Sequence, residues 1–577
     1  MKSKTPNFDE RIEELLKKLV PGTRVCKKTG ETWELTQEEI EWCRHFRVPP
    51  SDVSPLARLR MLTAFFVGYQ WWNNKSAKDG RTLVSSTHPA SGVKILPDEE
   101  WLQQDFSSLR RPIHSDTSVF RVLQELSREI PFMAFRNAVP PENSISTISM
   151  GDQNSYFMNA CRSKNSFFGM NALDTEDSAE VYQSGKIVGS YNVVHAERLY
   201  QCRFVQESRD CMSSAFLFDC RDCEHCFMAT NKRRAKYVWK NEQLSRQEYE
   251  KRIAEVDLSS RVRLEAYKTE FLELIRTQGI WPENFNEKAE QSSGEYLQEV
   301  TNCHFCYNNN YGCRDQLWCA YMFHETFQNA FDVGLFYGTN NCWGCSTGSR
   351  SANCLFSYLV VNCQRVEYSM HCYDCENCFG CVGLNRKKFH IFNTPCTEEE
   401  YYRLLDEIKC GMLERREYGE FLPATLSPTR FLDSGAALFL LADEVAGRQL
   451  GALEYAPESA GASGDPSIVL LPVGDIPDSI SDPSVEALSG KLFFDESLDR
   501  RFTFLKPEVE FYRAMKIGPP RDHFIARVRD LSFRANSGVF EDTICAKCSR
   551  NILVTKNKTF PSRTIYCRAC YQDTLSA

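Results

Sequence analysis

The chain has 577 residues, a formal net charge of −8 and 26 cysteines. This charge excludes a protein that is basic throughout, and the cysteine content is below that of small secreted disulfide scaffolds. The first residues lack the apolar segment of a signal peptide, and the most apolar run, GAALFLLA (435–442), is too short to span a bilayer. The sequence therefore predicts a cytoplasmic protein with reduced cysteines and no membrane contact.

In chain order, composition and hydrophobic periodicity predict seven segments. They are an N-terminal helix (1–21), a helical hairpin with a degenerate ribbon (22–105), a connecting helix and linker (106–150), a first repeat half with a long helix (151–300), a second repeat half with a helix (301–420), an acidic linker rich in Pro, Gly and Ala (421–490), and a helical hairpin with a zinc ribbon (491–577). The predicted fold class is α+β and rich in β-structure.

The two ends of the chain are related to each other. Residues 34–65 align without gaps with residues 503–534, at an offset of 469. Charged and apolar positions coincide, and in each copy the apolar positions recur every three residues. Each copy therefore predicts two short amphipathic helices separated by a turn that contains proline.

The centre of the chain is also duplicated. Residues 219–249 align without gaps with residues 371–401, at an offset of 152. Several cysteines pair at this single offset, among them Cys220 with Cys372, Cys223 with Cys375 and Cys226 with Cys378. A repeated unit of this length predicts two similar halves, at about 151–300 and 303–420.

The central cysteines recur at steps of nine residues, at 345, 354, 363, 372 and 381. This step predicts a β-solenoid with turns of about eighteen residues, in which thiols form an inward ladder and asparagines occupy the corners. A second metal site is an alternative, with ligands from Cys372, Cys375, Cys378, Cys381, Cys220, Cys223 and Cys226.

An iron–sulfur cluster is a further alternative for these thiols. Bacterial ferredoxins use the pattern C-x2-C-x2-C-x3-C-P. Here the last gap is two residues, and Val382 stands where proline is expected. The first half has only three of the four cysteines, so a cluster shared by both halves would need another ligand there, for which His225 is a candidate. Disulfides between turns, as in an extracellular adhesion solenoid, fit the spacing but not a cytoplasmic protein.

The clearest metal motif is at the C-terminus. Cys545-x2-Cys548 and Cys567-x2-Cys570, separated by eighteen residues, have the spacing of a zinc ribbon. Four thiolates would complete the tetrahedral shell, which predicts one structural zinc ion rather than a catalytic one.

The N-terminal copy lacks these cysteines. At the offset of 469 it has Ser76, Asp79, Asp98 and Trp101 in their places. We expect this copy to keep the hairpin shape without a metal, with Trp71, Trp72 and other apolar residues filling the space. Cys26 has Asp495 as its counterpart, and we expect it to be a buried thiol rather than a ligand.

The C-terminal segment is basic although the chain is acidic. Residues 501–577 hold 14 Lys and Arg against 7 Asp and Glu, a net charge of +7. The candidate phosphate contacts are Arg513, Arg527, Arg529 and Arg534. The alternative is an ordinary solvated charged face.

Several strings resemble a known family. CYDCENCFGCVGLNRKKFHIFN, YGEFLPATLSP and EVEFYRAMKIGPP with the C-terminal cysteines are similar to large cysteine-rich zinc-ribbon repeat proteins of candidate-phyla (Patescibacteria) bacteria, over nearly the whole chain. The resemblance implies an intracellular bacterial protein with central repeats and a terminal ribbon, and it implies no activity. Members often carry further cysteines where this chain has Asp495, Ser76 and Asp79, so additional zinc sites are not expected there.

Catalytic motifs such as G-x-S-x-G, Walker A and H-E-x-x-H are absent from the sequence. The sequence therefore favours a non-enzymatic, zinc-stabilised scaffold that binds a macromolecule, either nucleic acid or a ribonucleoprotein, through its basic C-terminal ribbon. The alternatives are an iron–sulfur or multi-zinc redox enzyme that uses residues 372–381, and a protein–protein interaction solenoid.

Overall fold

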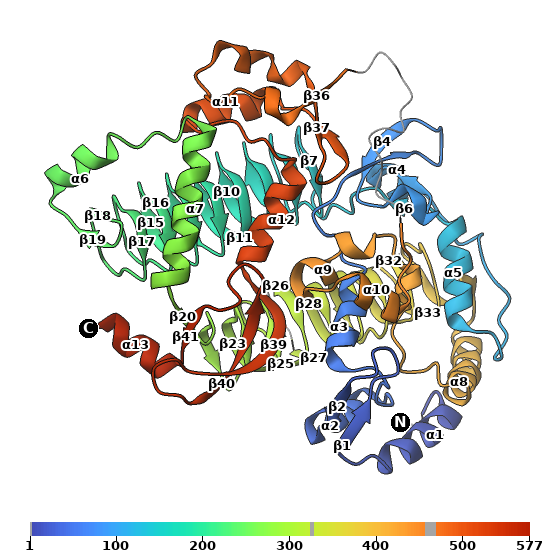
Figure 1. Ribbon diagram of the computed structural model, residues 1–577. Helices are drawn as coiled ribbons and strands as arrows, with labels where there is room; N and C mark the ends of the chain where they lie inside the picture. The colour runs from blue at the N-terminus through green and yellow to red at the C-terminus, as the bar shows by residue number, and fades with distance from the viewer. Residues whose placement is uncertain (1–2, 324–327, 456–468, 577) are drawn as a thin grey trace.

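The computed structural model describes residues 3–323, 328–455 and 469–576. It is a mixed α/β structure built around two large, mostly parallel sheets, which lie one above the other in Figure 1. We call them the first coil (145–243) and the second coil (287–395). The helices lie along the sides of the coils, and among the described residues no helix is both long and apolar enough to cross a membrane.

The first coil contains thirteen strands. They are β7 (Ile145–Thr147), β8 (Tyr156–Asn159), β9 (Arg162–Lys164), β10 (Phe167–Glu176), β11 (Ala179–Val188), β12 (Tyr191–Val194), β13 (Glu197–Tyr200), β14 (Arg203–Gln206), β15 (Arg209–Met212), β16 (Ala215–Phe218), β17 (Phe227–Thr230), β18 (Val238–Trp239) and β19 (Glu242–Gln243).

The second coil contains fifteen strands within the described ranges. They are β21 (Glu287–Glu290), β22 (Gly294–Glu295), β23 (Gln298–His304), β24 (Cys306–Tyr307), β25 (Arg314–Leu317), β26 (Ala320–Phe323), β27 (Gln328–Phe331), β28 (Gly334–Trp343), β29 (Ser346–Ala352), β30 (Tyr358–Val361), β31 (Gln364–Glu367), β32 (Met370–Tyr373), β33 (Glu376–Phe379), β34 (Lys388–Ile391) and β35 (Thr394–Pro395).

Most turns of the coils take twelve residues, not the eighteen expected from the sequence, and a few take eleven, thirteen or fourteen. Tyr191 pairs with Arg203, and Arg203 pairs with Ala215, all in parallel register. Every third residue from Asn165 to Lys240 has a positive φ, so each turn has four sides of three residues. The residue after each corner points its side chain inward. A step of nine residues between cysteines therefore spans three of the four sides of a turn, rather than half of an eighteen-residue turn.

The inward positions form two buried cores. Cys372, Cys375, Cys378 and Cys381 occupy the four inward positions of one turn, and all four are buried. The thiols of the first coil form a separate cluster with small and β-branched residues. All 26 cysteines lie within the described ranges and are free, and those of the coils fill two narrow cores as small apolar groups.

Helices from the two ends dock on the coils. The N-terminal pair is α2 (Gln37–Phe46) and α3 (Pro55–Thr63), and the C-terminal pair is α11 (Lys506–Met515) and α12 (Phe524–Arg534). Figure 1 shows α3 against the second coil and α12 against the first coil, as the contacts α3·β28 and α12·β11 confirm. Each end of the chain therefore packs on the coil that is distant from it in sequence.

A buried arginine marks each docking site. Arg58 of α3 forms ion pairs with Glu39 at 2.7 Å and with Asp332 of the second coil at 2.8 Å. Arg527 of α12 forms ion pairs with Glu508 at 3.4 Å and with Glu180 of the first coil at 2.6 Å. The two triads match at offsets of 469 and 152, because Arg58 and Glu39 correspond to Arg527 and Glu508, and Asp332 corresponds to Glu180.

The remaining elements connect or cover these parts. The helices are α1 (Pro6–Lys17), α4 (Asp98–Leu102), α5 (Val119–Glu129), α6 (Arg246–Ile253), α7 (Arg261–Gln278), α8 (Glu398–Glu414), α9 (Gly435–Leu440), α10 (Glu444–Leu450) and α13 (Arg568–Ser576). The short strands are β1 (Gly22–Val25), β2 (Thr32–Leu35), β3 (Trp72–Lys75), β4 (Thr82–Ser85), β5 (Ile95–Leu96), β6 (Phe132–Met133), β20 (Ile280–Pro282), β36 (Leu470–Pro472), β37 (Leu492–Asp495), β38 (Arg500–Phe502), β39 (Asn536–Ile544), β40 (Asn551–Asn557) and β41 (Thr564–Tyr566).

The segment 421–490 differs from the predicted linker. Its first part packs against the rest of the molecule through the apolar run at 435–442, in which Leu438, Phe439 and Leu440 are buried. Phe439 contacts Phe66 and Tyr321, which come from an end module and from the second coil. Residues 456–468 of the predicted linker lie outside the described residues.

Candidate metal centre

Four thiols converge at the tip of the C-terminal ribbon. Cys545 and Cys548 lie in the turn between β39 and β40, and Cys567 and Cys570 lie where β41 leads into α13. Their four Sγ atoms all lie within 4.8 Å of one another. Within residues 3–323, 328–455 and 469–576, this is the one group of three or more Cys, His, Asp or Glu ligand atoms that is compact enough to hold an ion.

The local backbone produces this convergence. In the first turn the N–H of Ser549 donates to the carbonyl of Cys545, and the N–H of Cys545 donates to the carbonyl of Arg550, both at 2.8 Å. Ser549 closes the turn with a φ of 61°. The N–H of Cys567 then donates to Cys545 Sγ at 3.2 Å, which brings the second pair of thiols to the first.

The geometry fits a tetrahedral zinc ion. Zn–S bonds of about 2.3 Å place tetrahedral sulfur ligands about 3.8 Å apart, and Cys548 Sγ lies 3.8 Å from Cys567 Sγ. Burial favours the neutral thiol of Cys545, but backbone N–H groups, chiefly that of Cys567, lower its pKa to about 6. Because zinc binds thiolates, these four residues could hold one structural zinc ion with no open coordination position.

The ribbon is attached to both coils. Tyr571 of α13 donates a short hydrogen bond to Asp219 of the first coil and accepts one from Arg233 at 2.8 Å. Strand β41 pairs in parallel with β20, which lies between the coils in sequence. At the other end of the ribbon, the N–H of Asn536 donates to the hydroxyl of Tyr296 of the second coil at 2.9 Å. A folded ribbon therefore helps to hold the two coils together.

The N-terminal copy keeps the hairpin of β3 and β4 and replaces the thiols by other contacts. The carboxylate of Asp98 accepts hydrogen bonds from the N–H groups of Phe135 and Asn137, both at 2.9 Å. The indole of Trp101 is buried and donates to the carbonyl of Pro131 at 2.7 Å. Cys26 is buried, as the sequence predicts.

The central cysteines have a different environment. Their thiols donate to backbone carbonyl groups two residues earlier and nine residues later, as Cys363 does to Val361 at 3.3 Å and to Cys372 at 3.3 Å. Burial holds the pKa of Cys220 well above its usual range, whereas hydrogen bonds from Cys211 and other neighbouring thiols lower the pKa of Cys223. A second metal site or an iron–sulfur cluster at Cys372, Cys375, Cys378, Cys381, Cys220, Cys223 and Cys226 stays a prediction.

The arginines expected to contact nucleic acid are mostly engaged inside the protein. Arg527 belongs to the buried triad, and Arg534 is buried, with its guanidinium donating to Asn192 at 2.6 Å. Arg529 is partly buried beside Asp433, at 3.3 Å. Arg513 is exposed and lies 3.4 Å from Glu486. Arg527 and Arg534 are therefore too deeply buried to contact a phosphate at the surface. The sequence does not reveal this, because helical spacing alone does not distinguish a helix face that packs on the protein from one that faces solvent.

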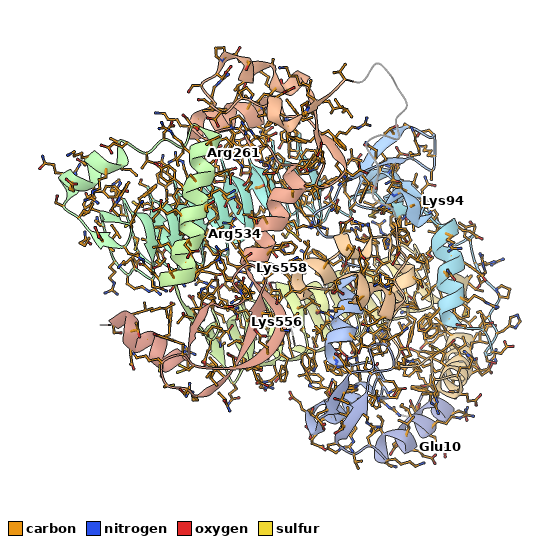
Figure 2. All side chains as sticks on the ribbon, viewed as in Figure 1. Glu10, Lys94, Arg261, Arg534, Lys556 and Lys558 are labelled. Atoms are coloured by element: carbon orange, nitrogen blue, oxygen red, sulfur yellow. The ribbon has the colours of Figure 1, made fainter. Side chains whose placement is uncertain are left out.

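Other basic residues surround the thiols instead. Lys547, Arg550 and Arg568 are exposed, and none forms an ion pair with another described residue. Lys556 and Lys558 lie further along the hairpin, as Figure 2 shows. The duplication could have identified Lys547 and Arg550, since Lys78 and Arg81 stand at the matching positions of the N-terminal copy. Both of those residues pair with Glu100, where the C-terminal copy has Ala569.

No model of a known protein family matches the chain. No curated protein matches it in sequence either.

Proposed function

We propose that this chain is a non-enzymatic, zinc-stabilised solenoid scaffold that binds RNA, free or within a ribonucleoprotein, through the surface of its C-terminal ribbon. The observation that carries the proposal is the four-thiol cluster flanked by the exposed Lys547, Arg550 and Arg568. A structural zinc ion would fix these three cations on one rigid element, and clustered cations supply the salt-dependent part of nucleic-acid affinity.

The N-terminal copy supports this reading by contrast. There the Glu100 carboxylate lies 3.3 Å from Lys78 and also pairs with Arg81, so both positive charges are neutralised within the protein. In the C-terminal copy the corresponding residue is Ala569, and among the described residues Lys547 hydrogen-bonds to the neutral hydroxyl of Thr574, at 3.0 Å, and forms no ion pair. The positive charges of the hairpin are therefore neutralised in the N-terminal copy and left without a carboxylate partner in the C-terminal copy.

The proposal also accommodates the resemblance to cysteine-rich zinc-ribbon repeat proteins, which implies central repeats and a terminal ribbon. The repeats would provide a rigid frame, and the ribbon would provide the contact. The redox alternative needs a cluster among the central thiols, but among the described residues only the C-terminal thiols converge closely enough to hold an ion.

The test is binding of single-stranded and double-stranded RNA and of DNA at several salt concentrations, measured by fluorescence anisotropy. The variant Lys547→Ala/Arg550→Ala/Arg568→Ala should weaken binding and lower the slope of log affinity against log salt by roughly 2. The matched control is Lys78→Ala/Arg81→Ala in the N-terminal copy, which should change neither quantity.

Binding that is independent of salt, or equal losses in the two variants, would contradict the proposal. A protein partner would then be favoured, because the same hairpin exposes Ile544 and Leu553, which are 58% and 37% accessible. Apolar side chains of this size at a surface are typical of protein contacts when they form a patch.

A further inference from the structure

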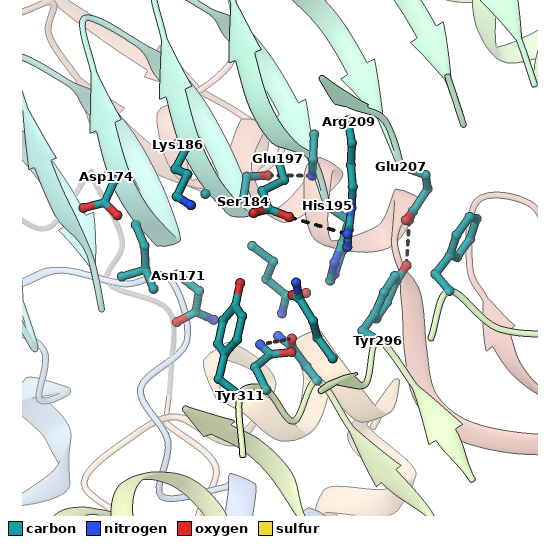
Figure 3. Close-up of a pocket in the computed structure, with 18 of the residues that line it drawn as sticks. Asn171, Asp174, Ser184, Lys186, His195, Glu197, Glu207, Arg209, Tyr296 and Tyr311 are labelled. Atoms are coloured by element: carbon teal, nitrogen blue, oxygen red, sulfur yellow. Dashed lines mark hydrogen bonds and ion pairs between the residues drawn. The ribbon is translucent and has the colours of Figure 1, made fainter. Parts of the chain in front are cut away.

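A cavity of about 340 Å³ lies between the two coils. Figure 3 shows strands of the first coil above it and segments of the second coil below it. Its wall on the first coil includes two columns of residues at twelve-residue steps. One column holds Asn171, Gln183, His195 and Glu207, and the other holds Leu173, Gly185, Glu197, Arg209 and Arg221.

The first column presents buried polar groups that lack partners within the protein. Asn171 is 6% exposed, and neither atom of its amide makes a hydrogen bond to a described residue. Gln183 is 8% exposed, and its Oε1 likewise has no such partner, although its Nε2 contacts the hydroxyl of Tyr321. Buried polar atoms are normally hydrogen-bonded, so these amides need partners from outside the chain.

The rest of the wall is polar, and its arginines are paired with carboxylates, whereas Lys186 forms no ion pair with a described residue. Arg209 lies 3.5 Å from Glu197 and also pairs with Glu287, and Arg162 lies 2.7 Å from Asp174. Glu207 accepts a hydrogen bond from the hydroxyl of Tyr296 at 2.7 Å, and burial holds the pKa of Glu207 well above its usual range. A cavity of this kind favours a neutral ligand over a phosphate or a metal cation.

The geometry of the first column limits the chemistry further. The ring of His195 stacks on Tyr296 with centroids 3.5 Å apart, and its Nε2 has no hydrogen-bond partner among the described residues. Successive residues of the column stand on neighbouring turns, about 4.8 Å apart. Amide and imidazole groups both donate and accept, and a hydroxyl group can satisfy either role. A ligand with several hydroxyl groups on one small ring matches all three side chains.

We propose that the cavity between the coils binds a small, neutral, polyhydroxylated molecule, such as a sugar, through Asn171, Gln183 and His195. The ligand can be a free monosaccharide or the terminal unit of a longer saccharide, since both present the same hydroxyl groups. This inference does not depend on RNA binding at the ribbon, because no lining residue of the cavity belongs to the ribbon.

The test is saturation-transfer NMR on the full chain, with a panel of pentoses, hexoses, N-acetylhexosamines, cyclic polyols and short oligosaccharides made from them. Two variants address the site. Asn171→Gly removes the amide at a φ of 52° that glycine adopts readily. Gly185→Leu adds a side chain to the second column, where the nearest atom to a new Cβ is the carbonyl oxygen of Leu173 at 3.7 Å.

The matched control is Asn353→Gly, the same substitution at an exposed corner of the second coil with a φ of 55°. Circular dichroism and thermal melting establish that each variant is folded. We expect one or more neutral members of the panel to bind, with at least tenfold weaker binding in Asn171→Gly and Gly185→Leu and unchanged binding in the control.

Preference for a monosaccharide or for an oligosaccharide identifies the source of the ligand. Two results would overturn the inference. The first is no saturation transfer from any member of the panel, which would mean that the cavity holds solvent only. The second is binding that survives in both folded site variants.

Discussion

The two docking triads, Glu39–Arg58–Asp332 and Glu508–Arg527–Glu180, have the same arrangement but different surroundings. In the C-terminal triad the Glu180 carboxylate also accepts hydrogen bonds from the hydroxyl of Tyr191 at 2.9 Å and from the amide of Asn192 at 2.7 Å. At the offset of 152, the second coil has Trp343 and Gly344 in these places, so the hydroxyl and amide donors of the first coil are replaced by the indole of Trp343 and by no side chain.

The electrostatic consequence is opposite in the two copies. Burial opposes ionisation of Glu180, but Arg527 and the neighbouring donors hold its pKa below the usual range. Burial raises the pKa of Asp332 to about 7, despite Arg58, and the nearby Glu39 adds to the rise. One arginine cannot fully neutralise two buried carboxylates. The hydrogen bond from Asn192 and the charge of Arg261 also favour the ionised form of Glu180.

The largest effect is expected where the two end modules differ most, at the ribbon. Cys545→Ser/Cys548→Ser removes two of the four ligands, and zinc binding of this type contributes on the order of 10 kcal/mol to folding. We expect residues 540–577 to unfold, which limited proteolysis and circular dichroism would detect. The matched change in the N-terminal copy, Ser76→Ala/Asp79→Ala, should leave both measurements close to wild type, and a wild-type digestion pattern for the cysteine variant would refute this view.

The next effect concerns the triads themselves. Arg527→Met leaves Glu180 and Glu508 buried without their cation, and breaking a buried ion pair costs about 3–5 kcal/mol. The equivalent Arg58→Met should cost less, because Asp332 can hold a proton at neutral pH. Thermal melting of both variants at pH 7 measures the difference, and a larger loss for Arg58→Met would reverse the ranking of the triads.

A pH dependence sharpens the comparison. Unfolded Asp titrates near 4, and folded Asp332 titrates at about 7, so the folded state binds more protons and its free energy of unfolding falls as the pH rises between these values. Asp332→Asn should therefore gain stability relative to wild type across this window. Glu180, with a lowered pKa, behaves in the opposite way, and Glu180→Gln should be most costly above about pH 4.5. Melting temperatures measured from pH 4 to pH 7 test both expectations. The same pH dependence in the two variants would rule out opposite pKa shifts for Asp332 and Glu180.

The smallest effect is expected inside the coils. Ser369 and Cys381 stand in the same inward column, and both donate to the carbonyl two residues earlier, at 2.9 Å and 3.4 Å. Cys381→Ser should therefore cost less than about 1.5 kcal/mol, whereas Cys381→Leu should cost about 1–3 kcal/mol by overpacking. Chemical denaturation checks both values, and a serine variant as unstable as the leucine variant would mean that the thiol has a role beyond packing.

The sequence indicates the duplications and the ribbon because both depend on residue identity at fixed spacing. It does not indicate the twelve-residue turn, since the inward positions recur every three residues and a nine-residue step fits several turn lengths. The alignment of the two ends matches Arg58 with Arg527 and Glu39 with Glu508, but the second acid of each triad comes from a coil that is distant in sequence. The cavity is also hidden, because Asn171 and Tyr296 meet only when the two coils pack together.

The most direct measurement is the metal content per chain, by elemental analysis with a visible spectrum, on wild type and two variants. The account predicts zinc in wild type, its loss in Cys545→Ser/Cys548→Ser, and its retention in Cys372→Ser/Cys378→Ser, with no absorbance near 400 nm. Zinc that remains in the ribbon variant, or iron that disappears with the central thiols, would contradict the account and favour a redox site in the second coil.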